Sequence, residues 1–328
     1  MAHPSHQYFL VADIGGTNTR VALSDGTRVL TSTIRRYRNA ENESLDAVLR
    51  EYRAAEDGVT PRAACVAVAG PVRDGKGRLT NLDWAIDEPT LRAATGAQNV
   101  ALLNDLQAQG YALDHVAEAD LLVVKTAPVA ADRAAKLVVN LGTGFNASAV
   151  FMTPSGPYVS TSESGHANMP VRDARDKRLC DYIAAKHGFA AIDDVLSGRG
   201  LARIYDFLSA EAGEDRTLNS ADVMQACETR SDPVAVATVR YFTELTAMVV
   251  GNLALIQLPF GGIYFVGGLS GAIAPYFELF EFNKAFRDKG RFASFMDDFG
   301  ISVVQDDYAA LKGAAAYLGT VSQGVSEI

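Results

Sequence analysis

A short segment near the start of the chain combines residue types that can bind phosphate. From Asp13 onward it runs Asp-Ile-Gly-Gly-Thr-Asn-Thr-Arg. Gly15 and Gly16 let the backbone turn sharply and approach a ligand, because they carry no Cβ. Thr17 and Asn18 can donate hydrogen bonds to phosphate oxygens, and Asp13 can hold Mg²⁺ through water. By itself the segment fits an ordinary glycine hairpin equally well, and it matches neither the P-loop nor the GxGxxG motif.

Residues 15–17 are the first of three glycine turns that follow apolar runs. Residues 142–144, with the sequence Gly-Thr-Gly, form the second turn, and Gly267 and Gly268 form the third. Each turn by itself can be a loop that merely needs a positive φ angle. Three such turns at strand ends can surround a nucleotide, with two of them flanking the phosphates and one lying under the adenosine.

Asn104 and Asp105 stand directly after the short apolar run of residues 100–103. A carboxylate in that position can be aimed into a cleft, where a kinase needs a base to position and deprotonate the attacking hydroxyl. The alternative is a helix N-cap, because Asn and Asp are both common there. For this pair taken alone, the cap is the better interpretation.

A polar loop with Glu163 and His166 has side chains that suit a sugar. Carboxylates and imidazoles discriminate between hydroxyl positions through directed hydrogen bonds. The alternative is a polar loop whose histidine has an ordinary structural partner. A zinc site is disfavoured, because no second His or Cys lies at ligand spacing.

The elements that must position these residues are strands joined by helices. Residues 8–13 and 20–24 predict one strand hairpin, and residues 136–141 and 146–151 predict a second of the same design. The two hairpins stand about 127 positions apart, which indicates a duplicated unit that faces phosphate. Other predicted elements are strands at residues 63–69, 100–103, 262–266 and 301–305, and helices at residues 42–55, within 173–257 and at 309–318.

The alternation of strands and helices predicts an α/β fold with sites at the strand ends. Residues 1–115 plus 305–328 are expected to form a small α/β domain, and residues 116–304 a large one with added helices. The stretch 247–258 is too short and too polar to span a bilayer, so a buried helix is predicted.

Composition excludes several classes of protein. The 328 residues carry a formal net charge of −9 and a pI near 5.1, which disfavours a nucleic-acid partner. The three cysteines are far apart, so neither a disulfide framework nor a structural zinc site is expected, and a reducing cytoplasm fits best. The first residues lack a cationic segment before an apolar run, so neither a signal peptide nor a membrane partner is predicted.

Taken together, these motifs resemble those of the bacterial glucokinases, in the hexokinase–actin–sugar kinase superfamily. The matches run in the family's order over almost the whole chain. They are D-x-G-G-T-N-x-R at residues 13–20, A-x-x-G-P at 67–71, T-N-x-x-W at 80–84, N-D at 104–105, E-x-G-H at 163–166, V-L-S-G-x-G-L at 195–201, F-G-G-x-x-x-x-G-G at 260–268 and D-K-G-R-F at 288–292.

The resemblance implies a two-domain actin-like ATPase (ribonuclease H-like) fold with an interdomain cleft that closes on sugar. It implies ATP-dependent phosphorylation of a hexose, glucose to glucose 6-phosphate, with Mg²⁺, by a cytoplasmic homodimer. Asp105 is then the general base on the 6-hydroxyl. The implied sugar ligands are Asn81, Asn104, Asp105, Glu163, His166 and Asp193. The implied nucleotide contacts are Asp13, Gly15, Gly16, Thr17, Asn18, Gly142, Thr143, Gly267 and Gly268.

Two positions depart from the family pattern. The family normally has Glu where this chain has Asp193, so the carboxylate reaches about 1.5 Å less far. The backbone then moves inward, a water bridges the gap, or the preferred sugar differs. In the second turn the family commonly has G-x-G-T-G-L-G, whereas Asn140 and Asn146 replace the outer glycines here. That replacement bears on nucleotide affinity and donor preference.

Three rival functions remain at this stage. One is a kinase for another hexose or an N-acetylhexosamine, although the cysteine-rich zinc motif of the related repressor-type kinases is missing. Another is a catalytically silent sugar sensor, which the presence of Asp105 disfavours. The third is an actin-like filament protein, in which Asn81, Glu163 and His166 would have no purpose.

Overall fold

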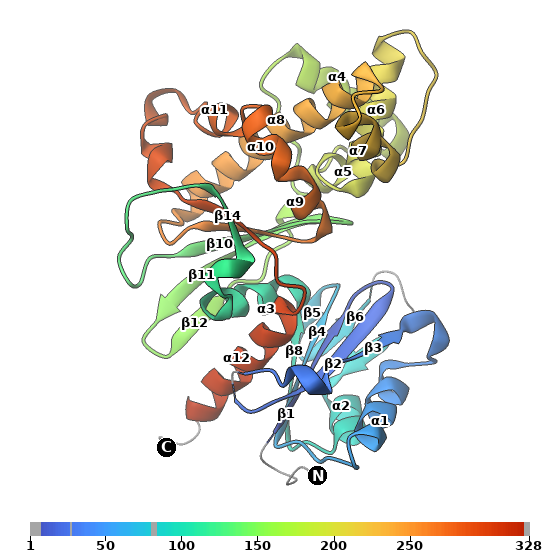
Figure 1. The fold of residues 1–328 in the computed structure, drawn as a ribbon, viewed down its shortest axis with the longest axis vertical. Helices are drawn as coiled ribbons and strands as arrows, with labels where there is room; N and C mark the ends of the chain where they lie inside the picture. Colours follow the sequence, from blue (N-terminus) through green and yellow to red (C-terminus); the bar gives the residue numbers. More distant parts are fainter. Residues whose placement is uncertain (1–7, 27, 80–83, 325–328) are drawn as a thin grey trace. The chain divides into compact units, whose positions relative to one another are not determined.

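The computed structural model describes residues 8–26, 28–79 and 84–324, and the chain divides into two compact units (Figure 1). The first unit comprises Met1–Ala117, Met152–Thr161 and Asp306–Ile328. The second comprises Glu118–Phe151 and Ser162–Gln305. The chain therefore begins and ends in the same unit, and the short segment Met152–Thr161 also belongs to it.

The first sheet has the strand order β3-β2-β1-β4-β8 among the described residues. Strands β1 and β2 form the predicted antiparallel hairpin, whereas β1, β4 and β8 are parallel. A smaller sheet has the order β5-β6-β7. The strands are β1 (Phe9–Ile14), β2 (Asn18–Ser24), β3 (Arg35–Arg38), β4 (Ala63–Val68), β5 (Val72–Arg73), β6 (Lys76–Arg78), β7 (Ala85–Asp87) and β8 (Asn99–Asn104).

Helices cover both faces of this first sheet (Figure 1). Alternate residues of β1, such as Leu10 and Ile14, pack with Val48 of α1 and Leu91 of α2. The other face of β1 and β4 packs against α12. The predicted helix at residues 42–55 begins later, because the Ser44 side chain caps it. The helices are α1 (Leu45–Ala55), α2 (Glu88–Thr95), α3 (Asp105–Ala112) and α12 (Ala309–Gly324).

Helices α3 and α12 approach each other closely. A Cβ built on Gly313 would lie only 1.7 Å from the Ala108 carbonyl oxygen, so this crossing requires glycine. The rings of Tyr111 and Tyr317 meet edge to face with centroids 5.1 Å apart. The last helix of the chain therefore supports the helix that begins at Asp105.

The second sheet repeats the pattern of the first. Its order in the described chain is β12-β11-β10-β13-β14-β9. Strands β10 and β11 form an antiparallel hairpin, and β10, β13 and β14 are parallel, so the predicted repetition of the hairpin is confirmed. The antiparallel edge strand β9 is an addition that the sequence did not predict. The strands are β9 (Leu121–Lys125), β10 (Lys136–Leu141), β11 (Phe145–Thr153), β12 (Gly156–Val159), β13 (Ile263–Val266) and β14 (Ile301–Val304).

The second unit is rich in helices, as the sequence predicted for residues 173–257. By length and composition α8 could cross a membrane, but 72% of its most apolar 18-residue window is buried in the protein. It is the core helix of this unit and contains all of the helical stretch predicted at 247–258 except Leu258, which is its C-cap. The helices are α4 (Ala174–His187), α5 (Ile192–Val195), α6 (Gly198–Glu211), α7 (Ser220–Glu228), α8 (Pro233–Gln257), α9 (Gly268–Ile273), α10 (Pro275–Leu279) and α11 (Phe282–Phe286).

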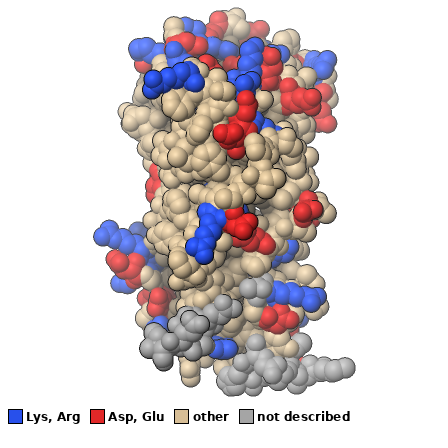
Figure 2. All heavy atoms as spheres, turned by 90° about the vertical axis from the view of Figure 1, so that its left-hand side faces the viewer, with Lys and Arg blue, Asp and Glu red and all other residues tan. Residues whose placement is uncertain are grey.

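Acidic and basic side chains are intermingled on the face shown in Figure 2. Red and blue groups lie next to each other in small clusters, and tan surface lies between these clusters. Nucleic-acid binders instead gather Lys and Arg on one face. The mixed charges on this face are therefore unlike a nucleic-acid-binding surface.

A buried carboxylate, Asp176, links the start of α4 to the core helix α8. Asp176 is only 1% exposed, and it accepts hydrogen bonds from Arg172 Nε at 2.8 Å and from Tyr241 Oη at 2.8 Å. Burial alone would raise the pKa of Asp176, but the hydrogen bonds from Arg172 and Tyr241 outweigh it and hold the pKa below its ordinary value. The charged form therefore stabilises the fold.

We expect Asp176→Asn to lower the free energy of unfolding by about 2–4 kcal/mol, because Arg172 then lacks a buried counter-charge. Urea denaturation at pH 7 measures it. Because the pKa of Asp176 is depressed in the folded state, the difference in unfolding free energy between wild type and Asp176→Asn is present above about pH 4. This difference shrinks as the pH falls below that. Asp181→Asn, which removes an exposed carboxylate from the same helix, is the control. Equal losses in the two variants would contradict the role of Asp176.

Candidate active site

Three parallel strands end level at one edge of the first sheet. Ile14 pairs with Val68, and Val68 pairs with Asn104, so the chain leaves β1 and β8 at the same edge. Two strand spacings separate these ends by about 10 Å. The first glycine turn, which follows Ile14, and Asp105, which follows Asn104, therefore lie along this edge.

A buried asparagine holds the first glycine turn. Asn39 is 2% exposed, and its Nδ2 donates to the Gly15 carbonyl at 2.8 Å. Its backbone N–H donates to the Thr17 carbonyl at 2.9 Å, and its Oδ1 accepts from Thr19 Oγ1 at 2.8 Å. Asn39 was not among the predicted site residues. It stands 24 positions from Gly15 in no recognisable motif, so the sequence carries no local signal for it.

Asp13 faces Arg20 across the β1–β2 hairpin, with Oδ2 and Nη1 3.4 Å apart. Burial raises the pKa of Asp13, and the charge of Arg20 opposes that rise. Within the described residues, no three His, Cys, Asp or Glu side chains gather into a metal cluster. A single carboxylate beside a glycine turn fits Mg²⁺, which takes most of its ligands from water and phosphate oxygens.

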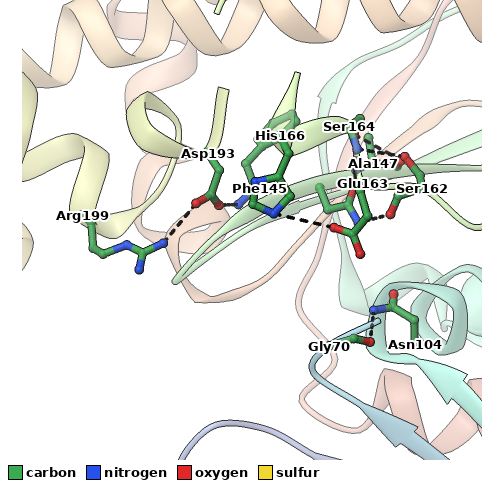
Figure 3. Close-up of polar contacts among 11 residues, drawn as sticks. Gly70, Asn104, Phe145, Ala147, Ser162, Glu163, Ser164, His166, Asp193 and Arg199 are labelled. Atoms are coloured by element: carbon green, nitrogen blue, oxygen red, sulfur yellow. Dashed lines mark hydrogen bonds and ion pairs between the residues drawn. The ribbon is translucent and has the colours of Figure 1, made fainter. Parts of the chain in front are cut away.

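Asn104 is the N-cap of α3. Its Oδ1 accepts from Leu106 N at 2.9 Å, and Gln107 Oε1 accepts in return from Asn104 N at 3.1 Å. Its Nδ2 donates to the Gly70 carbonyl at 3.0 Å (Figure 3). Asp105 is the first helical residue, and its Oδ1 also accepts from Leu106 N, at 2.8 Å. The capping box is complete without the Asp105 carboxylate.

The second and third glycine turns pack together in the second unit. Gly142 N donates to Gly144 O at 3.0 Å, which closes the second turn. A Cβ built on Gly142 would lie 3.9 Å from Gly267 Cα. Gly267 has a φ of +95°, and a Cβ there would meet Asn140 Oδ1 at 2.5 Å, so conformation and space both require glycine. Gly268 begins α9 directly after this turn.

Asn146 joins the loop of Glu163 and His166 to the second hairpin. Asn146 Nδ2 donates to the Ser162 carbonyl at 2.6 Å, and its Oδ1 accepts from Ser164 N at 3.0 Å. Glu163 Oε2 lies 3.9 Å from His166 Nε2, and both side chains are exposed. Two candidate sugar ligands are thus adjacent on a loop that the hairpin positions.

Asp193 lies beside the second turn, on α5. Its Oδ1 accepts from Phe145 N at 2.7 Å, and its Oδ2 accepts from Arg199 Nη2 at 3.0 Å. The inward contact places this carboxylate against the hairpin that carries the turn. Another candidate sugar ligand, Asn81, lies outside the described residues.

A groove of about 870 Å³ lies within the second unit. Helices α7, α8, α9 and α10 line it, with Met224, Arg240 and Tyr276 among the lining side chains. The rings of Tyr276 and Phe280 stack with centroids 5.6 Å apart. Gly271, one helical turn after the third glycine turn, lies on its wall. This volume and partly apolar lining suit a small organic ligand.

We expect Gly165→Ala to lower the free energy of unfolding by about 1–3 kcal/mol, because the added methyl cannot be accommodated without a backbone shift. A Cβ on Gly165 would lie 1.9 Å from the Phe145 carbonyl oxygen. Gly300→Ala is the control, since a Cβ there makes its nearest contact at 3.5 Å, an ordinary van der Waals distance. Chemical denaturation of both variants measures the difference. If Gly165→Ala were no less stable than Gly300→Ala, the packing of this loop on β11 would be wrong.

The sequence and the fold of this chain are both similar to those of known proteins. A family model described as glucokinase matches residues 10–321. A glucokinase from Cupriavidus pinatubonensis is 32% identical, and the match covers 96% of this chain and 93% of that protein. The crystal structure of a glucokinase from an Antarctic psychrotroph is 29% identical with a TM-score of 0.82, covering 96% of this chain and 99% of that one.

A glucokinase from Balamuthia mandrillaris, solved in complex with glucose, is 22% identical and has a TM-score of 0.79. The alignment covers 95% of this chain and 93% of that structure. At this identity the likeness concerns the fold. The predicted two-domain actin-like ATPase (ribonuclease H-like) fold is therefore confirmed.

Proposed function

The chain belongs to the glucokinase family and is a sugar kinase that phosphorylates glucose with ATP, and from that premise we propose that Asp105 is the general base. The observation that carries the assignment is the position of Asp105. It follows β8 at the strand edge that also carries the first glycine turn, and the cap of α3 is supplied by its neighbour Asn104.

The three glycine turns bind the nucleotide in this proposal. The first turn (with Asn18) contacts the phosphates, as do Gly142 and Thr143, because glycine turns of this kind bind anions. Gly267 and Gly268 lead the chain from the phosphate region into α9, and Gly271 lines the groove beside it. The adenosine occupies that groove. The partly apolar lining of this groove, which includes Gly271 one helical turn beyond Gly268 on α9, supports this division of roles.

The sugar is held by polar side chains from the predicted set. Asn104, Glu163 and His166 form hydrogen bonds to its hydroxyls, together with Asn81 and Asp193. The adjacent carboxylate and imidazole of Glu163 and His166 support this role, because together they can accept and donate hydrogen bonds to vicinal hydroxyls.

Asp105 orients the 6-hydroxyl of glucose and takes its proton as the oxygen attacks the γ-phosphorus of ATP. Transfer of the phosphoryl group leaves ADP and glucose 6-phosphate. Little covalent chemistry is asked of the protein, so positioning and charge stabilisation supply most of the rate enhancement. Mg²⁺ held near Asp13 would neutralise charge on the phosphates. Arg20 meanwhile keeps the Asp13 carboxylate paired.

The proposal also includes a homodimer in the cytoplasm. Family membership supports both, and the edge strand β9 offers an apolar surface with Leu122 and Val123 exposed. Sedimentation equilibrium of the purified protein tests the dimer. A panel of hexoses and N-acetylhexosamines in an ADP-release assay tests whether glucose is the preferred acceptor.

We expect Asp105→Asn to lower kcat by about 10²- to 10⁴-fold, because the amide cannot accept the hydroxyl proton. The change in glucose affinity should stay within about threefold, since the amide retains hydrogen-bonding capacity. A coupled ADP-release assay gives kcat, and calorimetry gives glucose affinity. Asp87→Asn is a matched control, because Asp87 caps α2 in the same unit. Near-normal turnover of Asp105→Asn would remove the base assignment.

We expect Asp13→Asn to raise the Mg²⁺ concentration for half-maximal rate by about 10- to 100-fold, as for other residues that hold a metal through water. Rates measured across a Mg²⁺ titration at saturating glucose give this value. Asp25→Asn, at an exposed carboxylate just after β2, should leave the titration unchanged. An unshifted titration for Asp13→Asn would show that the metal depends on other groups.

A further inference from the structure

The carboxylate of Asp193 is bonded on both sides within the second unit (Figure 3). Its Oδ1 accepts from Phe145 N at 2.7 Å, and its Oδ2 accepts from Arg199 Nη2 at 3.0 Å. The Asp193 side chain is 15% exposed, whereas the Arg199 side chain is 67% exposed. The carboxylate is therefore fixed in the protein, while the arginine covers it from the solvent side.

This carboxylate touches the second glycine turn itself. Phe145 directly follows the turn, and a Cβ built on Gly144 would lie 2.8 Å from Asp193 Oδ1. The other end of the turn is bound from the same segment, because Gly198 N donates to the Gly142 carbonyl at 2.9 Å. The short stretch from Asp193 to Arg199 thus holds the turn at both ends.

A negative charge at this place is unfavourable for a turn that receives a polyphosphate. Like charges within a few ångströms repel, and the repulsion is strong where one of them is largely buried. Neutralisation by a paired arginine removes that penalty and leaves the hydrogen bond to Phe145 N intact. Arg199 is placed to do this, since it bonds the oxygen that the backbone does not use.

The first glycine turn has the same arrangement. Asp13 precedes that turn, and Arg20 pairs with it from the opposite strand of the hairpin. In both halves of the fold, a poorly exposed aspartate beside a glycine turn therefore carries a more exposed arginine. The two pairs come from different positions in the repeated topology, so the repeat of the hairpin does not by itself explain the second pair.

We propose that Arg199 is a positioning residue for the nucleotide, because its guanidinium cancels the charge of Asp193 at the second glycine turn and so lets that turn accept the phosphates of a nucleoside triphosphate. The inference rests on the proposed function, in which this turn binds phosphate. In this proposal Asp193 helps to hold the turn that binds the nucleotide, in addition to its proposed contact with the sugar.

A double-mutant cycle tests the proposal. The affinity of the full-length protein for ATP, measured by calorimetry without sugar, is compared in wild type, Arg199→Gln, Asp193→Asn and the double variant. We expect Arg199→Gln to weaken ATP binding by about 5-fold or more, and the effect to shrink at high salt. The double variant should return to within about 2-fold of Asp193→Asn, because no uncompensated charge remains.

Two further variants separate charge from packing. Arg199→Lys keeps the positive charge and should restore most of the ATP affinity. Arg203→Gln is the matched control on the same helix, since Arg203 pairs with the neighbouring Asp194 at 2.7 Å, and that carboxylate caps α5 through Ala191 N. It should leave ATP affinity unchanged.

Two results would overturn the inference. One is an ATP affinity of Arg199→Gln equal to that of wild type. The other is a double variant as weak as Arg199→Gln alone, which would mean that Arg199 touches the phosphates directly. Failure of the proposed function is distinguishable, because it would appear as a wild-type protein that binds ATP but transfers no phosphate to glucose.

Discussion

Parallel strand pairing with level carboxyl ends is the constraint on which the rest of the structure depends. In the first unit, Ile14, Val68 and Asn104 lie side by side, and in the second unit Asn140 pairs with Val266. The backbone hydrogen bonds of each ladder fix this register, and a slip of one residue would turn every side chain to the opposite face. Polar residues distant in sequence thereby share one sheet edge, which is where α/β folds carry their sites.

The parts of the fold visible in the sequence are those with a strong local signal. Both hairpins combine apolar runs with glycine turns, and the strand before Gly267 ends in the same way, so the structure confirms them. Asn104 and Asp105 were harder to separate, because either residue can cap a helix. Only the observed geometry gives the cap to Asn104, through its bonds with Leu106 and Gln107.

The residues that support the site were invisible in the sequence for a physical reason. Asn39 and Arg199 act through hydrogen bonds or an ion pair to residues that other elements supply, and Asn146 stood out only as a departure from the family's glycine pattern. Neither periodicity nor spacing marks such a partner, because the distance is set by tertiary packing. The edge strand β9 was also missed. It pairs antiparallel with β14 and has no counterpart among the described strands of the first sheet, so the repeat of the hairpin does not predict it. The segment with Asn81 lies outside the described residues.

The discontinuity of the first unit has a consequence for synthesis. Its sheet leaves the ribosome early, yet the helix that covers one face of β1 and β4, α12, is translated after the entire second unit. Until then that apolar face lacks its cover, and such surfaces in unfinished chains are prone to aggregation. The close crossing at Gly313 also cannot form, so α3 and the residue at its start remain unsupported. Synthesis of α12 is therefore what completes the packing around α3, β1 and β4.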